Sequence, residues 1–181
     1  MVKGASASTP RRSGNTRPSA AKEDELRARA YAALAGVVDP EIPVLTIEDL
    51  GVLRELRFDG DAVEAVITPT YSGCPAMNVI AVEADLALER AGFSKRKITT
   101  VLSPAWTTDW MSDQGREKLK AFGIAPPAAS SSRSALFGEA VSCPRCASRE
   151  VERISEFGST ACKALWRCKA CREPFDHFKC I

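Results

Sequence analysis

The stretch Ala62–Pro75, with the sequence AVEAVITPTYSGCP, indicates how the main part of this chain folds. Val63, Ala65 and Ile67 lie on one face of a predicted strand at 62–68. Pro75 is typical of the first position of a helix, and Gly92 is typical of the residue after one. The densely apolar segment 75–91 is therefore a predicted helix, and 68–75 is the loop that leads into it.

The elements on either side of this stretch complete an α-β-β-α-β-α order. Asp59-Gly60-Asp61 predicts a hairpin turn between strands at 52–58 and 62–68. Helices are predicted on apolar residues from Leu26 to Val37 and at 113–122, the second of them capped by Ser112, and a third strand is predicted at 98–102. Because a helix joins the second and third strands, these should run parallel. We expect an α/β (α+β) fold for this part of the chain, a small mixed three-stranded sheet with helices, followed by a small C-terminal module.

Composition divides the 181 residues into four parts. Residues 1–21 are basic and lack apolar periodicity, which predicts a disordered tail, and the Pro-, Ala- and Ser-rich segment 126–140 predicts a linker. A domain is predicted between them at 22–125. Residues 22–140, which contain this domain, hold 13 basic and 18 acidic residues, and this acidic balance argues against a nucleic-acid groove. A single histidine excludes sites that need two, and no apolar run has the 18 residues of a membrane span.

The last part, 141–181, contains two C-x2-C pairs, Cys143/Cys146 and Cys168/Cys171. Two such pairs supply four thiolates at tetrahedral geometry, so we expect a zinc ribbon with short strands at 150–157 and 164–167. Iron is the alternative metal for four sulfur ligands. Cys162 and Cys180 are left over, either as packed residues or as an exposed thiol or further ligand.

A second candidate site lies where the segments 39–51, 69–74 and 103–110 meet, at the carboxyl edge of the predicted parallel strands. Cys74 precedes a helix N-terminus, which favours a thiolate and hence a reactive or metal-binding thiol. The alternative is a small buried residue. Asp39 and Glu41, which flank Pro40, are the carboxylates most suited to join it. Further candidates for this pocket are Glu48, Asp49, Asp109, Trp106 and Trp110. No catalytic step is assigned.

Several motifs resemble those of known families. The runs Asp39–Pro43 and Ile47–Gly51, together with Thr68–Pro75, resemble the SufT-like domain of iron–sulfur cluster assembly factors. The four-cysteine ribbon, the segment Phe157–Ala164 and the ending Cys171–Ile181 narrow the resemblance to the PaaD (PaaJ) family of subunits associated with the bacterial phenylacetyl-CoA 1,2-epoxidase. The resemblance runs from about residue 24 to the end. In the domain at 22–125 its matching positions are Asp39, Glu41, Thr70 and Cys74, and in the ribbon they are the four cysteines.

The resemblance implies a cytoplasmic role in aerobic phenylacetate catabolism, beside oxygenase and reductase subunits and with iron–sulfur assembly proteins as further partners. The leading hypothesis is a non-catalytic accessory subunit in which Cys74 transiently binds iron or an iron–sulfur cluster and the ribbon docks a partner. The second is a purely structural zinc-containing subunit. The third, a nucleic-acid-binding ribbon, is weakened by the acidic charge of residues 22–140.

Overall fold

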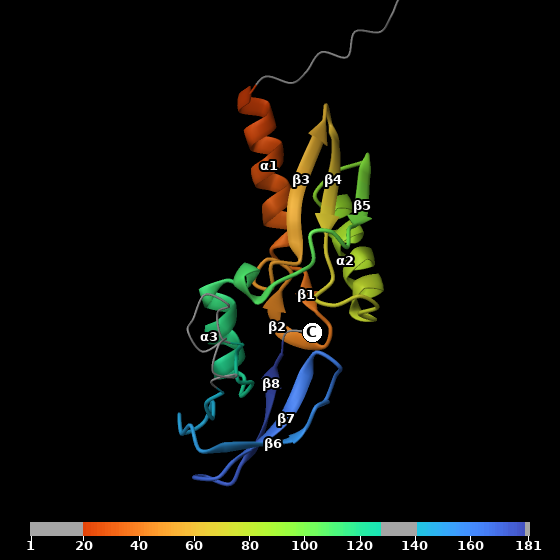
Figure 1. Ribbon diagram of the computed structural model, residues 1–181. Coiled ribbons are helices and arrows are strands. Elements are labelled where there is room, and N and C mark those ends of the chain that lie inside the picture. The colour runs from red at the N-terminus through yellow and green to blue at the C-terminus, as the bar shows by residue number, and fades with distance from the viewer. Residues whose placement is uncertain (1–19, 128–140, 180–181) are drawn as a thin grey trace, which may run out of the picture.

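The computed structural model describes residues 20–127 and 141–179 (Figure 1). The predicted tail 1–21 and linker 126–140 lie almost entirely outside these ranges, and so does Cys180. The first helix, α1 (Ala20–Leu34), begins at the end of the predicted tail. No helix within the described ranges is long and apolar enough to cross a membrane.

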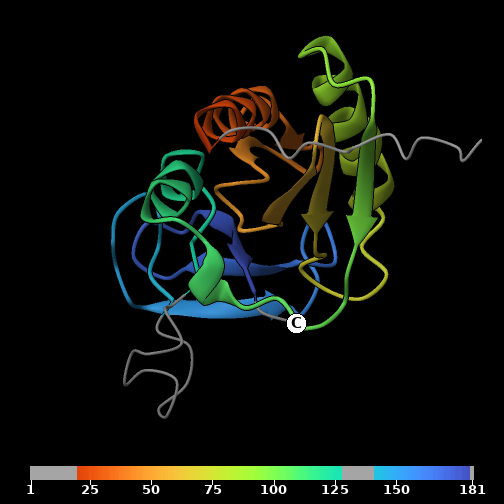
Figure 2. The ribbon, with the colours of Figure 1, turned by 90° about the horizontal axis from the view of Figure 1, so that it is seen from above.

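The predicted three-stranded sheet is present. It consists of β3 (Leu53–Asp59), β4 (Ala62–Ile67) and β5 (Arg96–Thr100) in that order. β3 and β4 are antiparallel, and β4 and β5 are parallel, as expected for strands joined through a helix. That helix is α2 (Ala76–Arg90), which packs beside α1 on one face of the sheet (Figures 1 and 2).

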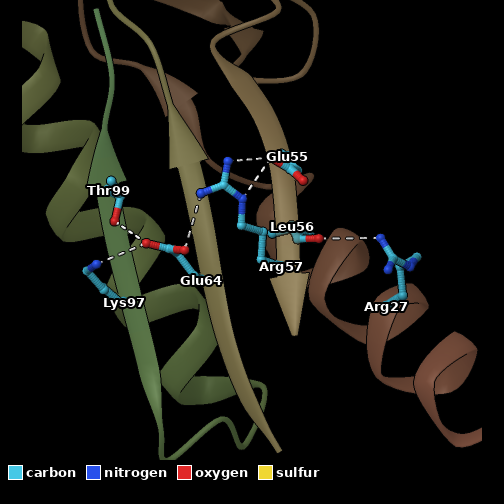
Figure 3. Close-up of polar contacts among 7 residues, drawn as sticks. All are labelled: Arg27, Glu55, Leu56, Arg57, Glu64, Lys97 and Thr99. Carbon is cyan, nitrogen blue, oxygen red and sulfur yellow. Dashed lines mark hydrogen bonds and ion pairs between the residues drawn. The ribbon is translucent and has the colours of Figure 1, made fainter. Parts of the chain in front are cut away.

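Polar side chains cover the other face of this sheet (Figure 3). Glu64 on β4 accepts hydrogen bonds from Thr99 Oγ1 at 2.6 Å and Lys97 Nζ at 3.0 Å on β5. It also forms an ion pair with Arg57 on β3 at 3.6 Å. Cross-strand pairs of this kind suit a solvated surface, which explains why the sheet carries helices on one side only.

A small hairpin that the sequence analysis did not predict precedes the sheet. It consists of β1 (Val38–Asp39) and β2 (Ile42–Thr46), paired antiparallel. Asp39 Oδ1 accepts hydrogen bonds from the backbone N–H groups of Glu41 at 2.7 Å and Ile42 at 3.0 Å. This side chain therefore builds the turn itself, as aspartate does in tight turns.

Helix α3 (Asp113–Ala121) follows a short 3-10 helix, η1 (Thr108–Trp110), and packs against β2. As predicted from the sequence, Ser112 caps α3, because its Oγ accepts a hydrogen bond from Gly115 N at 2.9 Å. Asp49, in the loop after β2, forms an ion pair with Lys118 of α3 at 2.6 Å. These contacts fix the helix to the rest of the domain.

The ribbon has three antiparallel strands where two were predicted: β6 (Val151–Ser155), β7 (Lys163–Cys168) and β8 (Pro174–Phe178). β8 also joins the segment that follows α3. Ala125 N donates to Asp176 O at 2.8 Å, and Phe178 N donates to Ala125 O at 3.0 Å.

The ribbon and the preceding domain also share a hydrophobic core. The main cluster of buried apolar residues contains side chains from α1, the sheet and α2, and it also includes Cys162 and Phe178 of the ribbon. A smaller cluster surrounds Cys143 and Cys168, with Phe175 of β8. The ribbon is therefore packed against the end of the domain that carries the β1–β2 hairpin (Figure 1).

Candidate functional site

The four cysteines of the C-x2-C pairs lie together. Their Sγ atoms are all within 4.8 Å of one another, with Cys143 to Cys171 at 3.7 Å and Cys146 to Cys168 at 3.6 Å. Sulfur atoms about 2.3 Å from a central zinc at tetrahedral geometry are about 3.8 Å apart. The spacing of the sulfur atoms therefore fits a tetrahedral metal ion.

Local backbone structure turns these sulfurs toward one point. The residue after each pair, Ala147 or Arg172, has a positive φ of 60° or 63°, which closes the tight turn of a knuckle. The N–H group of Cys171 donates to Cys168 Sγ at 3.4 Å. This hydrogen bond is the largest of the effects that lower the pKa of Cys168, because it stabilises the sulfur as a thiolate, the form that binds a metal.

Cys74 lies in the loop before α2, one residue before the N-cap Pro75, and its side chain is half-buried. We predicted from the sequence that the helix N-terminus would favour the thiolate form of Cys74. This prediction is wrong, because the sum of the effects on this thiol raises its pKa. Burial raises the pKa of Cys74, the N–H of Ala76 lowers it, and the nearby carboxylates of Glu41 and Asp39 raise it further. The thiol form is favoured because burial and negative charge outweigh the helix end.

The β1–β2 hairpin supplies both of these carboxylates. Asp39 is only 8% exposed, and burial raises its pKa, although the N–H groups of Glu41 and Ile42 lower it in part. Glu41 is partly exposed. The structure thus brings Asp39 and Glu41 close enough to Cys74 for their charges to act on its thiol.

Tyr71 belongs to the same group. Burial, followed by the charges of Cys74 and Glu41, raises its pKa to about 12. Its backbone carbonyl accepts a hydrogen bond from Cys74 N at 3.2 Å. The sequence analysis did not single this residue out, although it lies within the loop 68–75 that was examined.

Two residues of the ribbon complete the group, and the sequence analysis missed both contacts. Cys162 Sγ donates to Glu41 Oε2 at 3.7 Å, and Lys163 Nζ donates to the Glu41 carbonyl at 3.3 Å. Cys162 is 5% exposed, so it is not the exposed thiol that its small-residue loop suggested. Burial raises its pKa to about 11. No local signal marks these contacts, which join residues more than 100 positions apart.

Thr70, the remaining predicted residue of the loop, lines a neighbouring cavity of about 290 Å³ together with Tyr71, Leu102 and Trp106. Trp106 is also a core residue, because it is buried and its Nε1 donates to Leu50 O at 2.8 Å. Trp110 lies beneath the guanidinium group of Arg54, whose Cζ is 3.4 Å from the ring centroid.

The other candidate carboxylates have different positions. Asp49 is buried, and it bonds to Thr46, Ser112 and Lys118 rather than to the Cys74 group. Glu48 and Asp109 are exposed. Asp49 is therefore a structural residue that connects β2 to α3.

Comparison with known protein families identifies the class of protein to which each part of the chain belongs. Residues 27–99 match the family model described as iron-sulfur cluster assembly protein, and residues 127–179 match the PaaD zinc beta ribbon domain. The chain thus combines an iron–sulfur cluster assembly type of domain with a zinc-ribbon domain.

The relatives narrow this class further. The chain is 52% identical over 151 residues, 83% of this chain and 91% of the relative, to an Escherichia coli (strain K12) protein that is named as a subunit of 1,2-phenylacetyl-CoA epoxidase. The chain belongs to this PaaD family of epoxidase subunits.

Two shorter matches cover the domain before the ribbon. The chain is 34% identical over 92 residues, 50% of this chain and 89% of the relative, to the Fe-S protein maturation auxiliary factor YitW of Bacillus subtilis (strain 168). A solved structure of a domain of unknown function, DUF59, from Bacillus anthracis matches 53% of this chain and 92% of its own length. It has 23% identity and a TM-score of 0.49.

Proposed function

We propose that the chain is an accessory subunit of a phenylacetyl-CoA epoxidase system that assists the maturation of iron or iron–sulfur centres in its partner subunits. The observation that carries this proposal is the Cys74 group. A half-buried thiol lies beside the carboxylates of Asp39 and Glu41 in a domain of the iron–sulfur cluster assembly type. The B. subtilis relative, which is named as a maturation factor, supports this role.

The two cysteine sites of the chain are suited to different tasks. In the ribbon, four sulfurs surround one point and leave no place for an exchanging ligand, as in structural zinc sites. We assign zinc to Cys143, Cys146, Cys168 and Cys171 on this basis. The Cys74 group offers sulfur and oxygen atoms in a looser arrangement, which suits an iron cargo that must be bound and then released.

The chemistry of Cys74 also favours release. Because burial and the two carboxylates raise its pKa, the sulfur is protonated at neutral pH until a metal displaces the proton. A returning proton then competes with the metal, so the cargo is held reversibly. The proposal places maturation at residues 22–125 and assigns partner docking to the ribbon at 141–181, with oxygenase or reductase subunits as recipients in the cytoplasm.

The test is co-expression of the epoxidase subunits with the wild-type chain or with Cys74→Ser. We expect the variant to keep its zinc and its unfolding midpoint, while the partner subunits contain less iron or acid-labile sulfide. Ser72→Ala, an exposed change in the same loop, is the matched control. If partners made with Cys74→Ser were fully loaded, the maturation role would be wrong and a purely structural zinc subunit would be the better description.

A further inference from the structure

Cys162 lies in the ribbon but is oriented toward the domain at 22–125. Its Sγ contacts Glu41 Oε2 at 3.7 Å and Thr160 Oγ1 at 3.0 Å. The side chain is 5% exposed and belongs to the core cluster that both parts of the chain share. This thiol is thus separate from the four sulfurs of the ribbon.

The loop that carries Cys162 is fixed on both sides. Gly158 N donates to Lys163 O at 2.7 Å, which closes the loop, and Ser159 Oγ donates to Asp176 Oδ2 of β8 at 2.8 Å. Lys179 N donates to Cys162 O at 3.0 Å. The backbone at Cys162 is therefore held by a hydrogen bond from the residue that follows β8, and its loop is held by hydrogen bonds within the loop and to the side chain of Asp176.

The two thiols share their surroundings. Glu41 and Asp39 act electrostatically on both Cys74 and Cys162, and Tyr71 is influenced by both thiols. Lys163 Nζ, which is bonded to the Glu41 carbonyl, adds a buried positive charge beside this group. Two thiols and two carboxylates from opposite sides of the domain–ribbon contact thus form one electrostatic group.

We propose that Cys162 is a second sulfur ligand of the Cys74 site, so that a thiophilic divalent cation is bound between the domain and the ribbon by Cys74, Cys162 and Glu41. The inference rests on the proposed function, and it adds that the ribbon supplies part of the site that handles the cargo.

The ligand set suits such a cation. Sulfur ligands favour thiophilic first-row metals, and a carboxylate oxygen completes a mixed set of the kind that ferrous iron accepts. Each thiol releases its proton to solvent as its sulfur–metal bond forms, and no electron is transferred. In the described part of the chain, the ribbon cysteines are the one group of three or more metal-binding side chains gathered within 4.8 Å. Binding of a cation by Cys74, Cys162 and Glu41 would therefore require their side chains to rotate toward one another.

The experiment uses anaerobic, zinc-loaded full-length protein titrated with Co²⁺. Cobalt gives a sulfur-to-metal charge-transfer band that scales with the number of thiolate ligands, and it does not displace zinc readily, because zinc binds more tightly. The variants are Cys74→Ser, Cys162→Ser and Glu41→Gln, and Glu48→Gln is the control for loss of an exposed carboxylate in the same segment. Zinc content and the unfolding midpoint are measured for each variant.

We expect one added Co²⁺ per chain in the wild type. Cys162→Ser and Cys74→Ser should each lose about half of the charge-transfer intensity and bind at least about tenfold more weakly, since even loss of a supporting partner has that effect. Glu41→Gln should weaken binding without changing the band, and Glu48→Gln should bind as the wild type does. If Cys162→Ser loses its zinc, the titration is repeated with Cys162→Ala, because alanine places no hydroxyl group in the core.

Two results would overturn the inference. If Cys162→Ser and Cys162→Ala bind cobalt with the wild-type band while Cys74→Ser does not, Cys74 acts without the ribbon thiol. The proposed function then stands by itself. If the wild type takes up no cobalt beyond its zinc, the shared site does not exist. The iron content of partners made with Cys74→Ser then decides the maturation role separately.

Discussion

The ring of Phe178, on the last strand of the ribbon, meets the ring of Trp106 edge-on, with centroids 6.0 Å apart and planes at 73°. Phe178 is 1% exposed. Trp106 is itself fixed by a hydrogen bond from its Nε1 to Leu50 O. An aromatic pair in this geometry adds attraction to the burial of its area, so the contact stabilises the docking of the ribbon.

Replacement of Phe178 by alanine should therefore destabilise both the ribbon and the domain at 22–125. We expect Phe178→Ala to lower the free energy of unfolding by about 3–5 kcal/mol, the usual effect of removing a buried phenylalanine. Alkylation of Cys162 should become faster, because its cover against the domain is lost. Phe157→Ala is the control, since Phe157 is 65% exposed. Slow alkylation of Cys162 in Phe178→Ala would show that the ribbon stays docked without this contact.

Loss of a ribbon cysteine should remove zinc and unfold the strands that zinc stabilises. Cys168→Ser eliminates a buried ligand, and structural zinc sites contribute folding free energy directly. We expect less than one zinc per chain and loss of amide protection in β7 and β8, measured by hydrogen exchange. Cys74→Ser, the same substitution outside the ribbon, should keep full zinc. Full zinc in Cys168→Ser would contradict the four-sulfur assignment.

Asp49 should make stability depend on acid pH. Burial alone would raise its pKa, but hydrogen bonds from Lys118 and Thr46 lower it below the ordinary value of 3.8. A lowered folded pKa means that Asp49 contributes stability above that ordinary value, and that this contribution is lost as pH falls through the folded value.

Asp49→Asn should cost about 2 kcal/mol at pH 7, because it leaves the ammonium group of Lys118 without its charged partner. The difference from wild type should shrink at acid pH, as measured by urea denaturation at a series of pH values. Asp61→Asn, in the exposed pair with Lys95, should leave the urea midpoint unchanged. An equal loss in both variants would mean that Asp49 has no special structural role.

The cap of α3 gives a further prediction. Ser112→Ala removes the oxygen that accepts from Gly115 N, and it should lower the free energy of unfolding by about 1 kcal/mol. Ser112→Asp keeps a capping acceptor but places a second carboxylate beside Asp49, which Ser112 Oγ contacts at 3.2 Å. We therefore expect Ser112→Asp not to restore full stability, whereas Ser112→Thr should. Equal stability of the alanine variant and the wild type would rule out the cap as a stabilising contact.

The sequence predicted the features that depend on neighbouring residues. The hairpin at Asp59–Asp61, the cap at Ser112 and the parallel pairing of β4 with β5 follow from local turn chemistry and from the handedness of strand crossovers. The two C-x2-C pairs are also local signals, and their four sulfurs do gather at one point.

The features that the sequence did not predict depend on contacts between distant residues. Cys162 meets Glu41 across 121 positions, and no pattern near either residue records this. β8 is short and begins with proline, so its alternation was too brief to be recognised as a strand. The raised pKa of Cys74 results chiefly from burial, which only the packed structure reveals.

The place of β8 in the chain has a consequence for synthesis. This strand follows every other described element, yet Phe178 packs in the main core and its neighbour His177 pairs with Ala125. A chain emerging from the ribosome can form the sheet and helices early, since domains fold in order as they appear. It cannot close its core or bury Cys162 until β8 has been made. A message cut short before Phe178 would therefore yield a product with an open apolar surface, which quality-control proteases would be expected to remove.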